Sequence, residues 1–134
     1  MKNLILFLLL IVSISSCREE GIYTSEMNSD FSLSSSLKIK EGTFQPTVGI
    51  VVMGNVEIYI KEGKSYLKLS NFSVSKGPDL KVYLSKANTP TEFVNLGPLQ
   101  NDKIYELPIP IGGYSYVLIH CQQYNHLFAT AKLN

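Results

Sequence analysis

The sequence lacks an excess of charge of one sign, a set of paired cysteines and an apolar run long enough to cross a bilayer. Its 134 residues include 12 basic and 11 acidic side chains, two cysteines and no tryptophan. One basic residue, Lys2, lies in a leader that export would remove, which leaves 11 basic residues against 11 acidic ones. A neutral domain has no electrostatic footprint for nucleic acid, so we expect no nucleic-acid partner.

Helical periodicity and catalytic motifs are missing as well. No segment repeats apolar residues at helical spacing over about ten residues, and there is no phosphate-binding glycine loop and no zinc-ligand spacing. The acidic residues are scattered, which predicts no metal site built from them. We therefore expect an accessory domain and not a self-sufficient enzyme.

The first residues have the composition of an export signal. Lys2 is followed by the apolar residues 4–12 and then by Ile14-Ser15-Ser16-Cys17. This run is shorter than the roughly 20 residues that a membrane span requires. The sequence at its end resembles the bacterial lipobox, in which the cysteine becomes the lipid-modified first residue of the mature protein. The alternative is ordinary signal cleavage beside an incidental cysteine.

These features predict three segments. Residues 1–16 are a lipoprotein signal peptide, and residues 17–40 are a lipidated N-terminus with a serine-rich, flexible linker. Residues 41–134 are the folded domain. Lipidation at Cys17 would anchor the exported domain to a membrane surface, in the periplasm or at the cell surface.

Alternation of apolar and polar residues with a period of two predicts strands after residue 41. Residues 48–60, 65–72, 80–85, 93–96 and 104–109 fit this pattern, and Lys61-Glu62-Gly63-Lys64 has the composition of a tight hairpin turn. Short strands separated by turns indicate an all-β antiparallel sandwich or barrel of about 7–9 strands. We expect four tyrosines on its water-facing side: Tyr59, Tyr66, Tyr83 and Tyr116.

The last hairpin carries Cys121, which has no intramolecular partner if Cys17 is lipidated. Side chains alternate along a strand, so Cys121 shares a face with Val117 and Ile119, and His120 points to the opposite face. A lone exported cysteine is either a buried, inert thiol or a reactive one.

Two registers are open for this hairpin. A loop of residues 122–125 sets Cys121 opposite His126, whereas a loop that includes His126 sets Cys121 opposite Leu127. The second register keeps Ala129 and Ala131 on the same apolar face, and a slip of one residue would turn them outward. We therefore expect Leu127 opposite Cys121 and His126 in the loop.

Six motifs occur in order through the domain. They are Gly42-Thr43-Phe44, Gly54-x-Val56-Glu57-Ile58-Tyr59, Leu67-x-Leu69-x-Asn71-Phe72-x-x-Ser75-x-Gly77-Pro78-Asp79-Leu80-x-Val82-Tyr83-Leu84-Ser85, Leu96-Gly97-x-Leu99, Tyr105-x-Leu107-Pro108 and Cys121-x6-Phe128-x-x-Ala131-x-Leu133. Together they resemble the DM-thirteen electron-transfer domain, which is found beside DOMON domains in animal Skeletor-type proteins and alone in bacterial exported proteins. The resemblance covers residues 42–133.

The resemblance implies a redox role for the cysteine that matches Cys121, either as a bare thiol or as the ligand of a prosthetic group such as haem. The chain departs from the family pattern at His120, where the family has an aromatic residue that is usually Trp, and at Ala129, where the family usually has Gly.

His126 is a candidate second cofactor ligand because it lies close to Cys121 in the sequence. A blue-copper site needs two His, a Cys and usually a weak axial Met. His120 points away from Cys121 and the candidate Met53 lies on another strand, which disfavours copper.

The sequence thus predicts a membrane-anchored electron-transfer accessory domain that uses Cys121 and serves a redox partner protein. The alternative is a non-catalytic binding or adhesion lipoprotein in which Cys121 is only a core residue.

Overall fold

A computed structural model describes residues 32–134 of the chain, and this part folds into eight strands with no helix. The strands are β1 (Leu37–Pro46), β2 (Val52–Lys61), β3 (Lys64–Val74), β4 (Leu80–Ser85), β5 (Phe93–Pro98), β6 (Ile104–Glu106), β7 (Tyr116–Cys121) and β8 (His126–Lys132). The predicted all-β class and the range of strand numbers are confirmed. In the same part of the chain, no helix is long and apolar enough to cross a membrane.

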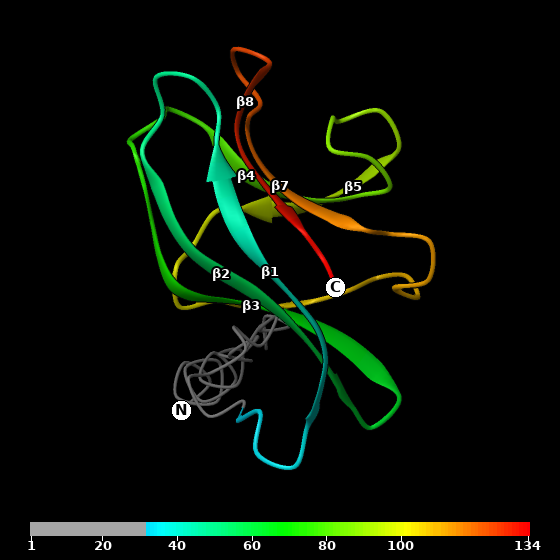
Figure 1. The fold of residues 1–134 in the computed structure, drawn as a ribbon. Helices are drawn as coiled ribbons and strands as arrows, with labels where there is room; N and C mark the ends of the chain where they lie inside the picture. The colour runs from blue at the N-terminus through cyan, green and yellow to red at the C-terminus, as the bar shows by residue number, and fades with distance from the viewer. Residues whose placement is uncertain (1–31) are drawn as a thin grey trace, which may run out of the picture. The chain divides into compact units, whose positions relative to one another are not determined.

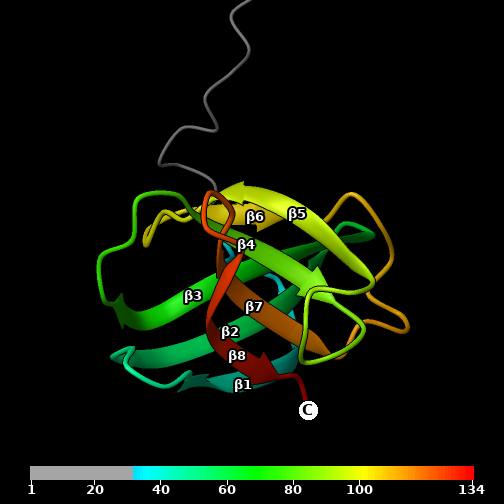
Figure 2. The same cartoon turned by 90° about the horizontal axis from the view of Figure 1, so that it is seen from above.

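The strands pair in the order β5-β4-β7-β8-β1-β2-β3-β6, and every neighbouring pair is antiparallel. In Figure 2 this order curves round into a nearly closed barrel. The two ends of the order are linked by Tyr105 of β6. Its hydroxyl donates to the carbonyl of Pro98, at the end of β5, over 2.7 Å and accepts from the N–H of Gln100 over 2.9 Å.

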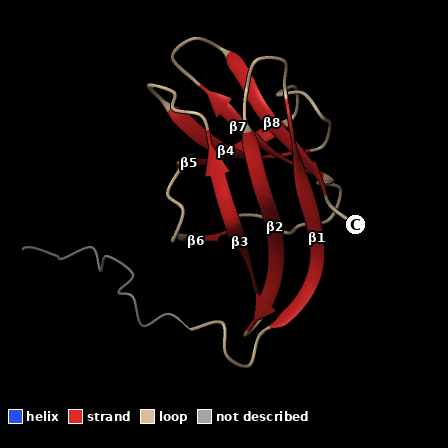
Figure 3. Cartoon of the chain, turned by 60° about the vertical axis from the view of Figure 1, so that its left-hand side comes forward, coloured by secondary structure: helices blue, strands red, loops and turns tan. Residues whose placement is uncertain are grey.

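Strand β1 belongs to both halves of the barrel. Its residues 37–43 pair with β2, and Phe44 to Pro46 pair with β8 (Figures 1 and 3). Where the strand passes from one partner to the other, a Cβ at Gly42 would collide with the carbonyl group of Lys132. Only glycine allows the two backbones to approach this closely.

The β2–β3 hairpin has the tight turn that the sequence predicts. Lys61 pairs with Lys64, and the two residues between them, Glu62 and Gly63, have φ angles of 50° and 76°. A two-residue turn whose backbone twist matches that of the flanking strands requires positive φ at both of its central residues. This turn fixes the register of the hairpin.

The barrel interior contains the apolar side chains that alternate along the strands. Val56, Ile58, Leu67, Val82, Leu84, Val117, Ile119, Ala129 and Ala131 are fully buried there. Burying each larger aliphatic side chain contributes about 1.5–3 kcal/mol. The core is therefore the main source of stability for a fold made of short strands.

Three strand limits differ clearly from those that the alternation predicts. Strand β2 begins at Val52 and not at residue 48, because Val48 and Gly49 form a turn. Strand β4 spans the residues expected, whereas β6 ends at Glu106 because Pro108 and Pro110 follow. Strand β1 begins at Leu37, so its first residues fall in the segment expected to be linker.

Candidate functional site

Cys121 is the last residue of β7 and lies in the barrel interior. Its side chain is 1% exposed and belongs to the same core as Val117 and Ile119. The sequence prediction that these three residues share a face is confirmed. In residues 32–134, Cys121 is the only free cysteine, and Cys17 lies outside the described residues.

The strand neighbour of Cys121 in β8 is His126 and not Leu127, so the predicted register is wrong at this point. The pairs Val117–Ala131 and Ile119–Ala129 occur as expected, but the ladder then shifts by one residue. Leu127 consequently lies opposite His120, and Phe128 is the extra residue of a bulge.

Two local features produce this register. Asn125 adopts a φ of 48°, which ends the loop after residue 125 and starts β8 at His126. Thr47 then holds the bulged backbone, because its N–H donates to the Phe128 carbonyl over 3.0 Å and its hydroxyl donates to the Leu127 carbonyl over 2.7 Å. His126 is exposed, and its ring meets that of Phe128 edge-on, with ring centroids 5.4 Å apart.

On its other side, Cys121 lies beside the start of β4. Leu80 is its partner in the β4–β7 ladder, and the N–H of Gln122 donates to the carbonyl of Asp79 over 3.0 Å. Gly77, in the turn before Leu80, packs so closely that a Cβ on it would lie 2.7 Å from a Leu80 methyl group and 2.9 Å from the Phe128 ring. Leu80, Phe128 and the backbone of Gly77 thus close this end of the barrel next to the thiol.

His120 lies on the outer side of β7, as the alternation predicts, but it is also buried, with 4% of its surface exposed. Its ring stacks on Tyr83 at 5.1 Å between centroids, and Tyr83 stacks on Phe93 at 4.3 Å. The Nδ1 atom of His120 is buried and has no hydrogen-bond partner among the described residues. Burial lowers the pKa of His120, and the nearby imidazole of His126 lowers it further.

Tyr83 is 3% exposed and Tyr66 is 5% exposed, so the prediction that these tyrosines face water is wrong. Burial raises the pKa of Tyr83, and the carboxylate of Asp79 adds to this effect. The outer side of β4 and β7 therefore carries a second buried layer, built from rings, that the sequence pattern did not reveal.

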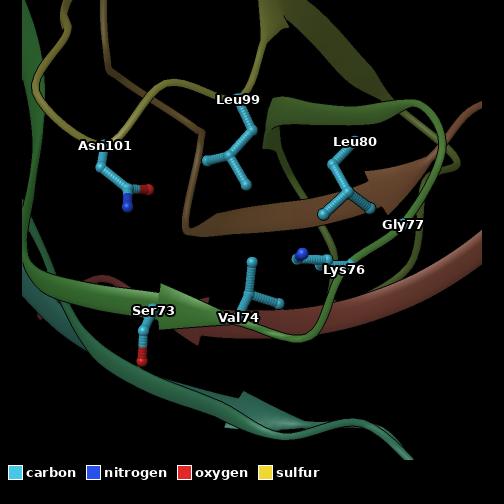
Figure 4. A pocket seen from close by; sticks show the side chains of 7 residues that line it. All are labelled: Ser73, Val74, Lys76, Gly77, Leu80, Leu99 and Asn101. Atoms are coloured by element: carbon cyan, nitrogen blue, oxygen red, sulfur yellow. The ribbon is translucent and has the colours of Figure 1, made fainter.

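A hollow of about 620 Å³ opens at the same end of the barrel. Its lining combines the end of β3, the β3–β4 turn and the segment after β5: Ser73, Val74, Lys76, Gly77, Leu80, Leu99 and Asn101 (Figure 4). Leu80 forms part of this lining and is also the ladder partner of Cys121. Leu80 therefore connects the hollow with the part of β7 that carries Cys121.

A family model described as Electron transfer DM13 matches residues 49–133. The chain belongs to this family. Membership in the DM13 family gives the domain a function related to electron transfer. No curated protein and no solved structure matches the chain.

The surroundings of Cys121 in this DM13 domain do not fit a haem. The sulfur lies in a closed apolar core, and Leu80 and Phe128 already fill the space against Gly77 that a macrocycle would need. The residues weighed as copper ligands also lie apart, since His120 is on the outer face and Met53 is 63% exposed on β2. Within residues 32–134, no group of three or more His, Cys, Asp or Glu side chains could hold a metal ion.

The residues around the hollow were not predicted as a site from the DM13 sequence. Gly77, Leu80 and Leu99 belong to the sequence motifs, but the approach of Leu99 and Asn101 to the β3–β4 turn depends on how β5 folds back on β4. The one signal in the sequence was the compact Lys76-Gly77-Pro78 turn, which could be interpreted as turn chemistry alone.

Proposed function

We propose that the chain is a membrane-anchored extracytoplasmic electron-transfer module in which Cys121 acts as a redox thiol. The observation that carries this proposal is the position of Cys121. It is the free cysteine among the described residues of a DM13 domain, and it lies at the end of the barrel where Leu80 and Phe128 pack against Gly77.

The chemistry open to one thiol is exchange with a partner disulfide. The Cys121 thiolate attacks a partner sulfur, a new S–S bond forms, the partner S–S bond breaks, and the second partner thiol leaves. The Cys121 proton passes to water. A donor dithiol of a second protein then attacks the Cys121 sulfur of the mixed disulfide: its first thiol displaces the remaining partner thiol, and its second thiol displaces Cys121. An electron pair thereby passes from the donor dithiol, which becomes a disulfide, to the partner disulfide, which becomes two thiols, without a bound metal.

This reaction requires the end of the barrel to open locally. The β7–β8 loop supports such an opening, because its residues 122–125 are exposed and Asn125 has a left-handed backbone. Local openings of this kind cost less than global unfolding and are typical of functional loops.

The anchor in this proposal is the lipid on Cys17, and residues 18–36 join it to β1. The domain would then work outside the cytoplasm, in the periplasm or at the cell surface, and would serve a redox partner protein. Its balanced charge supports no role in binding nucleic acid.

Thiol counting on protein purified from membranes tests both halves of the proposal. In denaturant, we expect one free thiol for each chain, because the lipid blocks Cys17; two free thiols would contradict the anchor.

Under native conditions, we expect Cys121 to react with a small disulfide reagent faster than global unfolding allows. A rate equal to the unfolding rate would contradict the redox role.

The alternative is a non-catalytic binding or adhesion lipoprotein. The 1% exposure of Cys121 within an aliphatic core favours it, since free cysteine is often a small buried apolar residue. Cys121→Ala distinguishes the two functions. Loss of electron transfer with the partner supports the redox module, and full retention of the cellular phenotype supports the binding protein.

A further inference from the structure

We propose that the hollow beside the β3–β4 turn binds a small amphipathic acid, with an alkyl body on its apolar wall and a carboxylate at Lys76. This inference goes beyond the proposed function and does not depend on Cys121 being redox-active. It rests on the composition of the lining, the charge balance of the turn and the place of the hollow in the barrel.

The apolar wall comes from three different segments. Figure 4 shows the side chains of Val74, Leu80 and Leu99 pointing toward one space. All three are only partly buried and pack on the edge of the core, so each presents apolar surface to the hollow. Its volume of about 620 Å³ lies within the range of small-molecule sites.

The lining also carries polar groups that can donate hydrogen bonds. In Figure 4 the ammonium group of Lys76 extends into the same space, with the amide of Asn101 at its edge. Lys76 forms no ion pair within residues 32–134, because the acidic residue of the same turn, Asp79, is paired with Lys81 over 2.9 Å. An unpaired cation next to an apolar wall is complementary to a carboxylate on a hydrocarbon chain.

The backbone supports this geometry. Gly77 lies against Leu80 and Phe128 without space for a Cβ, so the turn that carries Lys76 is fixed relative to the wall. The N–H of Leu99 donates to the carbonyl of Leu80 over 2.9 Å, which fixes the two apolar residues relative to each other. The apolar wall and the backbone of the turn are therefore in place before a ligand arrives, which lowers the cost of ordering them.

The test is a titration of the isotope-labelled full chain with octanoate and with 1-octanol, followed by NMR. The two probes share a hydrocarbon chain and differ in the carboxylate. We expect octanoate to shift the methyl signals of Val74, Leu80 and Leu99 and to bind about fivefold more tightly than octanol, as one partly exposed charge pair allows.

Lys76→Gln should weaken octanoate binding by about fivefold and leave octanol binding unchanged. Lys132→Gln is the matched control, because Lys132 is an exposed lysine at the other end of β8 and its loss should change neither affinity. Leu99→Asn should weaken both probes.

Three results would overturn the proposal: no shifts at the three wall residues, equal affinity for octanoate and octanol, or equal octanoate binding by Lys76→Gln and Lys132→Gln. The Lys76→Gln titration keeps the test decisive if Leu99→Asn does not fold, because Lys76 is exposed and lies outside the core.

Discussion

The two sides of β7 bury different chemistry within one short strand. Its inner side presents Val117, Ile119 and Cys121 to a continuous apolar core, with each side chain 1% exposed or less. Its outer side presents Leu118 and His120, which are also buried, at 0% and 4% exposure. There the cover is a stack of rings in which Tyr83 lies between Phe93 and His120.

The difference lies in how well each side satisfies its polar atoms. A thiol can be buried among aliphatic groups at little cost, because it behaves as a small apolar side chain. An imidazole nitrogen needs a hydrogen-bond partner when it is buried, and Nδ1 of His120 has none among the described residues. A buried, unsatisfied polar atom costs about 1–3 kcal/mol. The strand therefore gains stability on the inner side and loses part of it on the outer side.

The largest effect should come from the inner side. Ile119→Ala is expected to lower the free energy of unfolding by about 2–5 kcal/mol, because it leaves a cavity opposite the small Ala129. Phe93→Ala, on the partly exposed end of the ring stack, should cost less, since solvent already reaches that ring. Urea titrations measure the free energy of unfolding of both variants. Equal decreases in the two variants would contradict the proposed difference between the two sides of β7.

A smaller effect tests whether the thiol is only an apolar group. Cys121→Ser places a hydroxyl in the aliphatic core and should lower the free energy of unfolding by about 1–3 kcal/mol relative to Cys121→Ala. Urea titration again provides the measurement. If serine and alanine prove equally stable, the position has a polar partner, and the inner side is less apolar than the structure indicates.

Sequence alternation was enough to predict the inner side of β7 but not its surroundings. The period of two placed Cys121 with Val117 and Ile119 and gave the limits of β4 correctly, because both depend on local pattern. The partner of Cys121 was missed because a left-handed Asn125 and a bulge at Phe128 shift the register together. The burial of Tyr83 and the hollow were missed because both depend on how β5 and the segment after it fold back.

The outer side should respond to pH through His120. Burial lowers the pKa of His120 in the folded chain. Below about pH 6.5, His120 is therefore protonated in the unfolded chain while it is still neutral in the folded chain. Stability is then complete above that pH and falls as the pH decreases toward the folded pKa. His120→Phe should keep the ring stack and reduce this loss of stability in acid.

Urea titrations between pH 7.5 and 5 measure the effect on His120, with His126→Gln as the control. The ionisable groups that face His120 are Lys81, across the ladder, Asp79, which is paired with Lys81, Tyr83 in the stack, and His126 at the hairpin end. His126 is exposed, so its loss should leave most of the acid sensitivity in place. An unchanged pH profile in His120→Phe would assign that sensitivity to other groups.

The smallest effect concerns the ion pair at the edge of the outer side. Lys81 lies opposite His120 in the ladder, its side chain is 19% exposed, and its ammonium is 2.9 Å from Asp79. Lys81→Gln should lower the free energy of unfolding by no more than about 1 kcal/mol, because solvent still screens the pair.

The matched variant Lys64→Gln breaks a pair of the same length, with Glu106, at a side chain that is 60% exposed, and it should produce no measurable change in the free energy of unfolding. Since salt screens the more exposed pair more strongly, repeating both titrations in high salt should reduce the difference between the two variants without abolishing it. Equal losses in the two variants would mean that the outer side of β4 and β7 stabilises its ion pair no better than an exposed hairpin does.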